Sequence, residues 1–259
     1  MVSYPDITIT FLGTGTSSGV PMIGCSCEVC TSSDLKDKRL RSSILVQSKT
    51  TTLVVDTTPD FRYQMLREDV KKLDAVVFTH PHKDHIAGLD DVRAYNFFSK
   101  KAMEVYANEL TQDALKKEFS YVFAEKQYPG IPKIHLNTIL RSPFCVGDIY
   151  VIPIAVMHLK MPVLGFRFGK FTYITDANFI DEEAKNIIKG SEVLVLNALR
   201  QEKHISHFSL SEAKLISAQM NIPRTYLTHI SHQMGKHSNV NKTLDSSIQL
   251  AYDGMTLNV

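Results

Sequence analysis

The most constraining feature of this sequence is an H-x-H-x-D-H pattern, which places three histidines and one aspartate within six residues. An apolar run, Ala75 to Phe78, precedes the pattern and is typical of a buried strand. The residues after it open an amphipathic segment, so the pattern lies on a strand-to-helix loop, where side chains can converge. Imidazole nitrogen and carboxylate oxygen suit zinc, iron or manganese, and a polar loop that is histidine-rich by chance is the weaker interpretation. The predicted metal ligands are His80, His82, Asp84 and His85.

The composition is that of an ordinary globular protein. The 259 residues are enough for one large domain or two small ones, and 44% of them are hydrophobic. A formal net charge of +2 gives no support to a broad basic surface, so extended nucleic acid is not an expected partner. The N-terminus lacks a basic segment followed by an apolar run, and 18 consecutive apolar residues occur nowhere. We therefore expect neither a signal peptide nor a membrane span.

Three of the four cysteines form a C-x-C-x-x-C pattern at Cys25, Cys27 and Cys30, and Cys145 stands alone. A secreted disulfide framework would pair its cysteines more evenly, so a reducing cytoplasm is the expected compartment. Three thiolates this close supply three quarters of a tetrahedral zinc site, whose fourth ligand must come from elsewhere. The alternative is a set of buried or reactive thiols, but so short a loop has little core in which to hide them. The pattern favours structural zinc.

Strand and helix patterns alternate along the whole chain, without a linker, a low-complexity run or a clear repeat. This order predicts one domain over residues 1–259, with two β-sheets inside and helices outside. Predicted strands cover residues 7–12, 43–47, 52–56, 75–78, 104–106, 134–140, 149–156, 164–168, 171–174, 193–196 and 225–228. Predicted helices lie near residues 61–66, 89–98, 110–119, 182–189 and 240–250, and one begins at Ser209 with a carboxylate three residues later.

Two polar loops follow early strands. The loop Gly13–Gly19 carries three glycines but matches neither phosphate-binding fingerprint, so a tight turn is favoured over a phosphate cradle. The segment Asp56–Asp60 precedes a predicted helix, and its Asp and Thr residues are interpreted as candidate caps.

Further candidate ligands stand at strand ends in the second half of the chain: His158, Asp176 and His229. Each is a weak signal alone, since His158 could be a satisfied polar residue and Asp176 a helix cap. Strands ending at one edge of a layered fold would bring them to the H-x-H-x-D-H loop. Five histidines and two aspartates are enough for two metal ions that share one carboxylate. Two ions about 3.5–4 Å apart can bind the attacking and leaving oxygens of a displacement.

With these motifs, and with Phe11-Leu12-Gly13-Thr14-Gly15, the sequence resembles the metallo-β-lactamase-fold hydrolases. Within that superfamily it is most similar to the phosphoribosyl cyclic phosphodiesterases of the carbon–phosphorus lyase pathway. The more specific likeness lies in Gly19-Val20-Pro21, the cysteine pattern, Thr175-Asp176 and the segment 227–233, Leu-Thr-His-Ile-Ser-His-Gln. The resemblance implies an α/β fold, an αββα sandwich of two mixed β-sheets with helices outside.

The resemblance also implies a division of ligands between two divalent ions, for which manganese, zinc and iron all remain open. One ion would take His80, His82, His158 and Asp176, and the other Asp84, His85, Asp176 and His229. His232 would complete the structural zinc with the three cysteines. Asp84 and His207 are the candidate catalytic residues, and His207 would protonate the leaving group, although a surface position for it or for His204 is the alternative. Lys160 and Arg200 are candidate phosphate contacts by position, and a homodimer is expected.

The expected function is hydrolysis of cyclic or small nucleotide or sugar phosphodiesters by metal-bridged hydroxide. A tRNA 3′-end-processing endonuclease shares the loop, but it carries a protruding basic arm, and no Gly- and Lys/Arg-rich insertion occurs here. A thioester hydrolase of the glyoxalase II kind uses similar ligands but should lack the cysteine pattern. A non-enzymatic metal-stabilised binding module is disfavoured because no ligand is missing.

Overall fold

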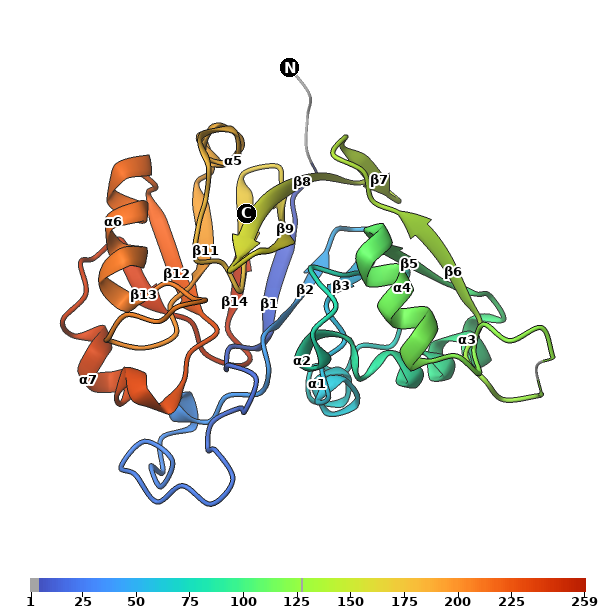
Figure 1. The fold of residues 1–259 in the computed structure, drawn as a ribbon, viewed down its shortest axis with the longest axis horizontal. Coiled ribbons are helices and arrows are strands. Elements are labelled where there is room, and N and C mark those ends of the chain that lie inside the picture. Colours follow the sequence, from blue (N-terminus) through green and yellow to red (C-terminus); the bar gives the residue numbers. More distant parts are fainter. Residues whose placement is uncertain (1–4, 127) are drawn as a thin grey trace.

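The computed structural model describes residues 5–126 and 128–259, whose strands form two seven-stranded sheets (Figure 1). The first sheet has the order β14-β1-β2-β3-β4-β5-β6 and the second β13-β12-β11-β10-β9-β8-β7. The first consists of β1 (Thr8–Gly13), β2 (Ser43–Gln47), β3 (Thr52–Val55), β4 (Ala75–Val77), β5 (Met103–Ala107), β6 (Ile134–Thr138) and β14 (Thr256–Asn258). The second consists of β7 (Phe144–Val146), β8 (Ile149–His158), β9 (Met161–Phe168), β10 (Phe171–Ile174), β11 (Val193–Asn197), β12 (Arg224–Thr228) and β13 (Ile248–Leu250).

Both sheets are mixed. Strands β3 to β6 pair in parallel, and β1 pairs antiparallel with both β2 and β14. In the second sheet, β10 to β13 are parallel, and β9, β8 and β7 continue antiparallel from β10. Helices cover the outer faces: α1 (Phe61–Arg67), α2 (Lys83–Ile86), α3 (Arg93–Ser99), α4 (Glu109–Glu118), α5 (Glu182–Ile188), α6 (Leu210–Met220) and α7 (His237–Asn241). The predicted αββα sandwich is confirmed.

Alternation along the strands explains the layers. In β11, Val193 and Val195 belong to the apolar cluster between the sheets, whereas Leu194 and Leu196 pack with α5 and α6 residues. β4 divides its side chains in the same way, because Val76 belongs to the cluster under α1, α3 and α4. Successive strand residues point to opposite faces, so a strand covered on both sides is apolar throughout.

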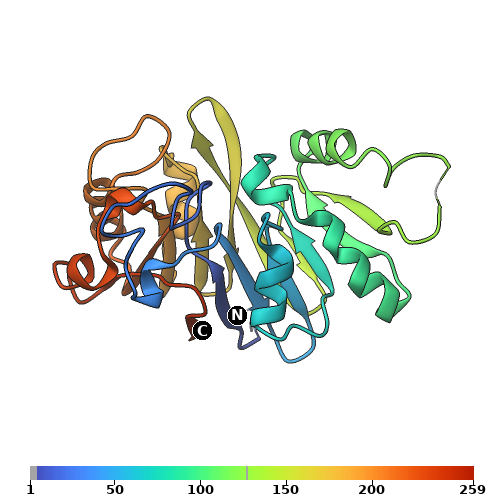
Figure 2. The ribbon, with the colours of Figure 1, turned by 90° about the horizontal axis from the view of Figure 1, so that it is seen from below.

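The carboxyl ends of the parallel strands β4, β10 and β12 are followed by loops that carry the predicted ligands His80 to His85, Asp176 and His229, and His158 ends the antiparallel strand β8. Figure 2 views the molecule from below, onto the side on which α1 and α2 lie in Figure 1. The helix at Ser209 begins as predicted, with a capping box formed with Glu212.

One predicted helix is wrong. Residues 240–250 do not form a continuous helix: α7 ends at Asn241, and Ile248–Leu250 is strand β13. There Ile248 and Leu250 are buried on either side of exposed Gln249, and β13 pairs in parallel with β12. The predicted helix 89–98 is also divided, into a 3-10 turn (Leu89–Val92) and α3. None of the helices described in residues 5–126 and 128–259 has the length and apolarity to cross a membrane.

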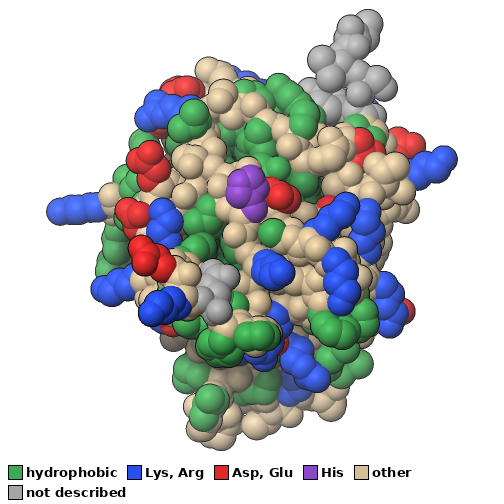
Figure 3. Space-filling view, turned by 90° about the vertical axis from the view of Figure 1, so that its right-hand side faces the viewer, with side chains coloured by type: hydrophobic (Ala, Val, Ile, Leu, Met, Phe, Trp, Pro, Cys, Tyr) green, Lys and Arg blue, Asp and Glu red, His purple; other side chains and the backbone are tan. Residues whose placement is uncertain are grey.

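Figure 3 shows the side of the molecule at the right of Figure 1, where basic, acidic and hydrophobic side chains are intermixed. Exposed Phe97 and Phe98 of α3 belong to the hydrophobic side chains of the surface. Lys100 lies over the ring of Phe97, with 4.3 Å between its Nζ and the ring centroid.

Candidate metal centre

The H-x-H-x-D-H loop connects β4 to α2, as predicted. His80 is fully buried, His82 precedes the first turn of α2, and Asp84 and His85 lie within that turn. The Nε2 atom of His80 lies 3.1 Å from Nδ1 of His82. Because α2 begins directly after His82, one short segment presents both histidines and the acidic pair to the same space.

Four of the predicted ligands form one tight group: Asp84, His85, Asp176 and His229. Their candidate ligand atoms all lie within 4.8 Å of one another. Asp176 is central, since its Oδ2 lies 3.2 Å from Nε2 of His85 and 3.1 Å from Nδ1 of His229. This group matches the set that the resemblance implies for one of the two ions.

A second group joins His158, Asp176 and His207, again within 4.8 Å, so Asp176 belongs to both groups. The second predicted set contained His80 and His82 in place of His207. Those two are not part of this group: the ring centroids of His82 and His80 lie 5.1 and 6.0 Å from that of His158, whereas the centroids of His158 and His207 are 4.7 Å apart. His207 instead places Nε2 3.1 Å from Oδ1 of Asp176.

Partner groups fix the ring orientation of three histidines. Nδ1 of His80 lies 2.9 Å from the hydroxyl of Thr79, which itself donates to a carboxylate. Nδ1 of His158 lies 2.9 Å from the carbonyl oxygen of Ser206. Nδ1 of His85 lies 2.8 Å from Oδ2 of Asp56. In each case Nδ1 must carry the proton, so Nε2 keeps its lone pair for a metal ion.

Sequence reasoning missed Asp56, which it interpreted as a candidate helix cap. Its carboxylate accepts hydrogen bonds from the backbone N–H and the hydroxyl of Thr79, and from His85. The side chain is fully buried and caps no helix. The usable signal was its place at the end of β3, beside the strand that leads into the histidine loop.

The glycine-rich loop also has a role that the sequence did not reveal. The hydroxyl of Thr16 lies 3.2 Å from Nε2 of His229, and both side chains are buried. Gly15 bridges to Arg41 and to Ile230, which joins the loop to the segment that carries His229. The loop therefore holds a candidate ligand in place.

Backbone conformation marks the same residues. Asp56, Asp176 and His229 have φ values of 67°, 57° and 56°, in the left-handed region. Non-glycine residues rarely adopt this region, and such strain is concentrated at functional sites. Asp56 and His229 directly follow β3 and β12, and Asp176 lies two residues after β10. At each of these positions the chain turns the side chain into the centre.

The charges in the centre suit a cation. Burial lowers the pKa of His229 to about 4 and holds that of His80 well below its usual value, so both rings are neutral, as metal ligands must be. Burial would also lower the pKa of His85, but the carboxylates around it, led by Asp84 and Asp176, raise that pKa well above its ordinary value. Without a bound metal ion, His85 is therefore protonated on Nε2 as well as on Nδ1 and balances the carboxylates, and a divalent ion would take the place of the proton on Nε2.

One buried atom shows directly that the residues fit a metal. Nε2 of His85 has no hydrogen-bond partner among the residues that the structure describes, although its side chain is 1% exposed. A buried nitrogen without a hydrogen-bond partner is costly unless a bound ion or water completes it. The carboxylates of Asp84 and Asp176 lie 3.3 and 3.2 Å from this atom, so a divalent ion between them would be bound by all three.

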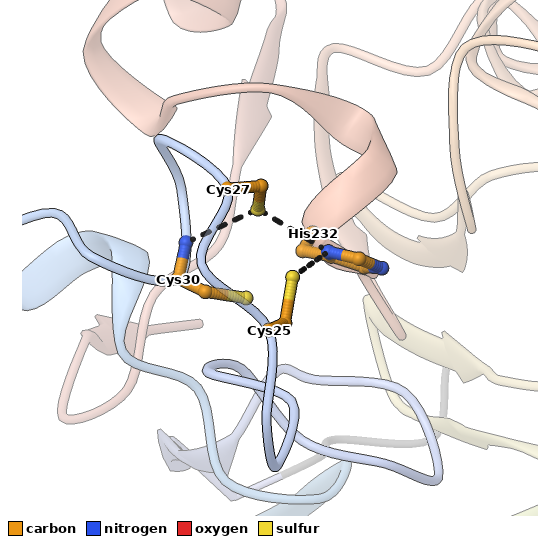
Figure 4. Close-up of side chains that lie close together, drawn as sticks. All are labelled: Cys25, Cys27, Cys30 and His232. Carbon is orange, nitrogen blue, oxygen red and sulfur yellow. Dashed lines mark hydrogen bonds between the residues drawn. The ribbon is translucent and has the colours of Figure 1, made fainter.

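The cysteine pattern lies beside His232, as the resemblance implied (Figure 4). The sulfurs of Cys25 and Cys27 each lie 3.3 Å from Nδ1 of His232, and Cys30 completes a group within 4.8 Å. A hydrogen bond from the backbone N–H of Cys30, followed by His232, lowers the pKa of Cys27 to about 6, whereas burial raises the pKa of Cys30 to about 11. Three sulfurs and one imidazole nitrogen at this spacing fit tetrahedral zinc.

The two candidate phosphate contacts differ. Lys160 is exposed on the turn between β8 and β9, two residues after His158. Arg200 uses its guanidinium within its own loop, donating to the carbonyls of Glu202 and Lys203 and to the side chain of Gln233. Lys160 therefore stays a candidate phosphate contact, whereas the hydrogen bonds of Arg200 brace its own loop.

Replacing Asp56 by Asn should weaken metal binding about 10- to 100-fold, the usual cost of losing a partner that orients a metal-binding histidine. An amide offers one acceptor oxygen where Asp56 accepts three hydrogen bonds. Competition with a chelator measures the affinity. Asp69→Asn, in an exposed ion pair with Lys71, is the control that should match the wild-type protein. Equal affinities for all three proteins would contradict the role of Asp56.

Comparison with known proteins agrees with this geometry. The family model of the β-lactamase superfamily domain matches residues 51–230. A solved structure described as a new diphosphatase from the PhnP family is 40% identical, with a TM-score of 0.91 and 97% of each chain covered. The chain belongs to the metallo-β-lactamase superfamily. The metallo-β-lactamase fold, together with the two groups of candidate ligands, implies divalent metal ions. Zn²⁺-bound PqqB from Methylobacterium extorquens shares the fold. It is 18% identical, with a TM-score of 0.79, and the match covers 97% of this chain and all of that one.

Two curated relatives are longer proteins. An octanoyltransferase of Porphyromonas gingivalis is 38% identical over 247 residues, which are 94% of this chain and 50% of the relative. The exodeoxyribonuclease YycJ of Bacillus anthracis is 27% identical over 135 residues, 50% of this chain and 46% of the relative. The chain thus spans about half the length of these curated relatives.

Proposed function

We propose that this metallo-β-lactamase superfamily member is a dinuclear phosphodiesterase that hydrolyses cyclic or small nucleotide or sugar phosphodiesters. The observation that carries the proposal is the pair of overlapping groups that share Asp176. We assign Asp84, His85, Asp176 and His229 to one ion. To the other we assign His158 and Asp176 of the second group together with His80 and His82, whose facing nitrogens lie 3.1 Å apart, and we reserve His207, the third member of that group, for proton transfer. Two bound divalent ions would neutralise phosphate charge and activate water. Manganese and zinc are the candidate ions, with iron as a further option.

The residues of the chain supply orientation, charge and a proton. Asp56 orients His85 by accepting a hydrogen bond from its Nδ1, so that its Nε2 faces the carboxylates of Asp84 and Asp176. Lys160 is exposed two residues after His158 in the chain, and its side chain would contact the phosphate. The side chain of His207 is 12% exposed, and its Nε2 lies 3.1 Å from Oδ1 of Asp176, the carboxylate that the two candidate ions would share. Because Nε2 is at the centre and can still be reached from solvent, a proton on this nitrogen would pass to the departing oxygen of a substrate bound there. Its other nitrogen lies 2.9 Å from the hydroxyl of Ser206, which fixes the ring.

Three further assignments complete the proposal. Cys25, Cys27, Cys30 and His232 bind a structural zinc. It ties the loop of residues 25–30, which we call the knot loop, to the segment that also carries His229. The small number of cysteines outside this site fits a reducing cytoplasm. A homodimer is the proposed assembly, and light scattering of the purified protein would show it.

The comparisons support phosphorus chemistry over thioester hydrolysis. The 40% identical structure is described as a diphosphatase, and the relative in Bacillus anthracis is named an exodeoxyribonuclease. The human tRNase Z structure is 17% identical, which shows a common fold alone. The name octanoyltransferase belongs to a protein of twice the matched length. A substrate screen should therefore include cyclic and linear phosphodiesters, diphosphates, tRNA precursors and thioesters. Fastest turnover of a small phosphodiester is expected, and a faster thioester or tRNA substrate would overturn the proposal.

Replacing His207 by Gln should slow esters with alkoxide leaving groups about 10²- to 10⁴-fold, the usual contribution of a general acid. Esters of p-nitrophenol should be slowed far less, because that leaving group departs without a proton. Parallel rate measurements on the two kinds of ester, with metal content determined for each protein, make the comparison. His135→Gln is the control, because His135 lies on β6 in contact with Glu104. Equal slowing of both esters would remove His207 from the proton transfer.

A further inference from the structure

Three exposed apolar residues lie beside the centre, and nothing in the proposed chemistry uses them. Leu159 directly follows His158, Phe179 lies three residues after Asp176, and Ile205 precedes His207 by two. Their side chains are 49%, 56% and 77% exposed. Each member of the second candidate ligand group therefore has a large apolar neighbour along the chain. We call Leu159, Phe179 and Ile205 the apolar rim.

Hydrogen bonds hold the three segments of the apolar rim together. The side-chain oxygen of Asn178 accepts from the backbone N–H of Leu159 at 2.8 Å, and its amide donates to the carbonyl of Ile205 at 3.1 Å. The backbone of Phe179 bridges to Met157, with the Met157 N–H 3.0 Å from the Phe179 carbonyl. One asparagine thus links all three segments, so the rim is a fixed feature rather than three separate exposed side chains.

The same segments reach the candidate ligands. The carbonyl of Ser206, next to Ile205, receives the hydrogen bond from His158. Leu159 has a φ of 55°, a left-handed conformation that is rare for leucine and that turns the chain sharply after His158. Strain of this kind persists where the surrounding structure requires it. The rim is continuous with the centre on the side where His158 and His207 lie.

Single exposed apolar side chains are ordinary, but a fixed group of three beside a strongly polar centre is not. An exposed aromatic ring, on a segment hydrogen-bonded to two others that each carry an exposed aliphatic side chain, is a surface on which a flat ring can stack. Nucleic-acid bases stack on such side chains without hydrogen-bond readout, because every base has an apolar face. A sugar ring lacks the flat π-face through which a base stacks.

We propose that the apolar rim binds a heteroaromatic base of the substrate, so that the enzyme selects nucleotide over sugar phosphodiesters. This inference rests on the proposed function, because the phosphate of the same molecule must lie at the metal centre. The Lys160 side chain extends from the same turn as Leu159, so the charged and apolar parts of one small nucleotide have neighbouring partners.

Binding of two phosphate compounds to the metal-loaded protein tests the proposal. Adenosine monophosphate and ribose 5-phosphate differ mainly in the base, and calorimetry gives the affinity of each without turnover. The wild-type protein should bind adenosine monophosphate about tenfold more tightly. In the double variant Phe179→Ser/Ile205→Ser this preference should disappear, while ribose 5-phosphate binds as before. The matched control is Phe98→Ser/Leu140→Ser, whose residues are also exposed but are remote in sequence from the ligands.

The outcomes separate the two proposals. The proposal that the apolar rim binds a base would be overturned if the wild-type protein had equal affinities for both compounds, or if the preference survived in the rim variant. Either result would leave the phosphodiesterase proposal standing. Failure of the metal-loaded wild-type protein to bind either compound would overturn both. The same pair of variants can then be compared on adenosine 2′,3′-cyclic phosphate, for which the rim variant should show a raised KM and a retained kcat.

Discussion

Asp176→Ala should lose more than about a hundredfold in phosphodiester hydrolysis and should retain less of both catalytic ions. The expected loss exceeds that for an orienting partner because Asp176 contacts the candidate ligands of both groups. Its carboxylate lies 3.2 Å or less from His85, His207 and His229, so its removal leaves three imidazoles without their shared partner. Steady-state rates on a model phosphodiester, together with metal analysis of the same preparation, measure both effects.

The control for this substitution is Asp245→Ala. Asp245 is exposed and pairs with Lys214 at the surface, so rate and metal content should stay at wild-type values. A thermal melt of the Asp176 variant shows whether the fold persists. Turnover within tenfold of the wild-type protein, in a folded variant, would contradict the shared-ligand assignment.

Cys27→Ser should lose one metal equivalent, lower the thermal midpoint by about 5 °C or more, and slow hydrolysis. A change of 1 kcal/mol moves the midpoint of a domain of this size by about 2–4 °C, and structural zinc contributes several times that. The knot loop has only a small apolar cluster of its own, formed around Val20, Val29 and Cys30. His232 follows His229 by three residues, so loosening the zinc site should also displace a ligand of the catalytic centre.

Cys145→Ser is the matched control for the Cys27→Ser substitution. Cys145 is exposed on β7 and is a free thiol, so its replacement removes the same atom without touching the site. The control should keep metal content, thermal midpoint and rate unchanged. Identical zinc content in the Cys27 variant and the wild-type protein would contradict a structural zinc.

The sequence predicted much of this centre because ligands at strand ends follow local rules. A buried strand followed by clustered histidines predicts that the loop between β4 and α2 binds a metal, and this prediction uses adjacent residues alone. His158, Asp176 and His229 were weaker signals, because only the pairing of distant strands brings them to Asp84 and His85. The family resemblance supplied that pairing.

What the sequence did not reveal depended on contacts between remote segments. Asp56 has the local pattern of a helix cap, and its bond to His85 requires β3 and β4 to lie side by side. The helix predicted over residues 240–250 was wrong for the same reason. Apolar residues at Ile248 and Leu250 are compatible with a helix or with a strand, and only the pairing with β12 makes this segment a strand. The apolar rim likewise depends on Asn178, whose two hydrogen bonds no periodic pattern predicts.

The most direct test of the central claim is a metal titration of phosphodiester hydrolysis. Purified protein should contain about three metal equivalents per chain, and chelation that removes the two catalytic ions should abolish turnover. Returning manganese or zinc should restore activity, with saturation at two added equivalents per chain. Full turnover in protein freed of catalytic metal, or saturation at one equivalent, would contradict a dinuclear phosphodiesterase.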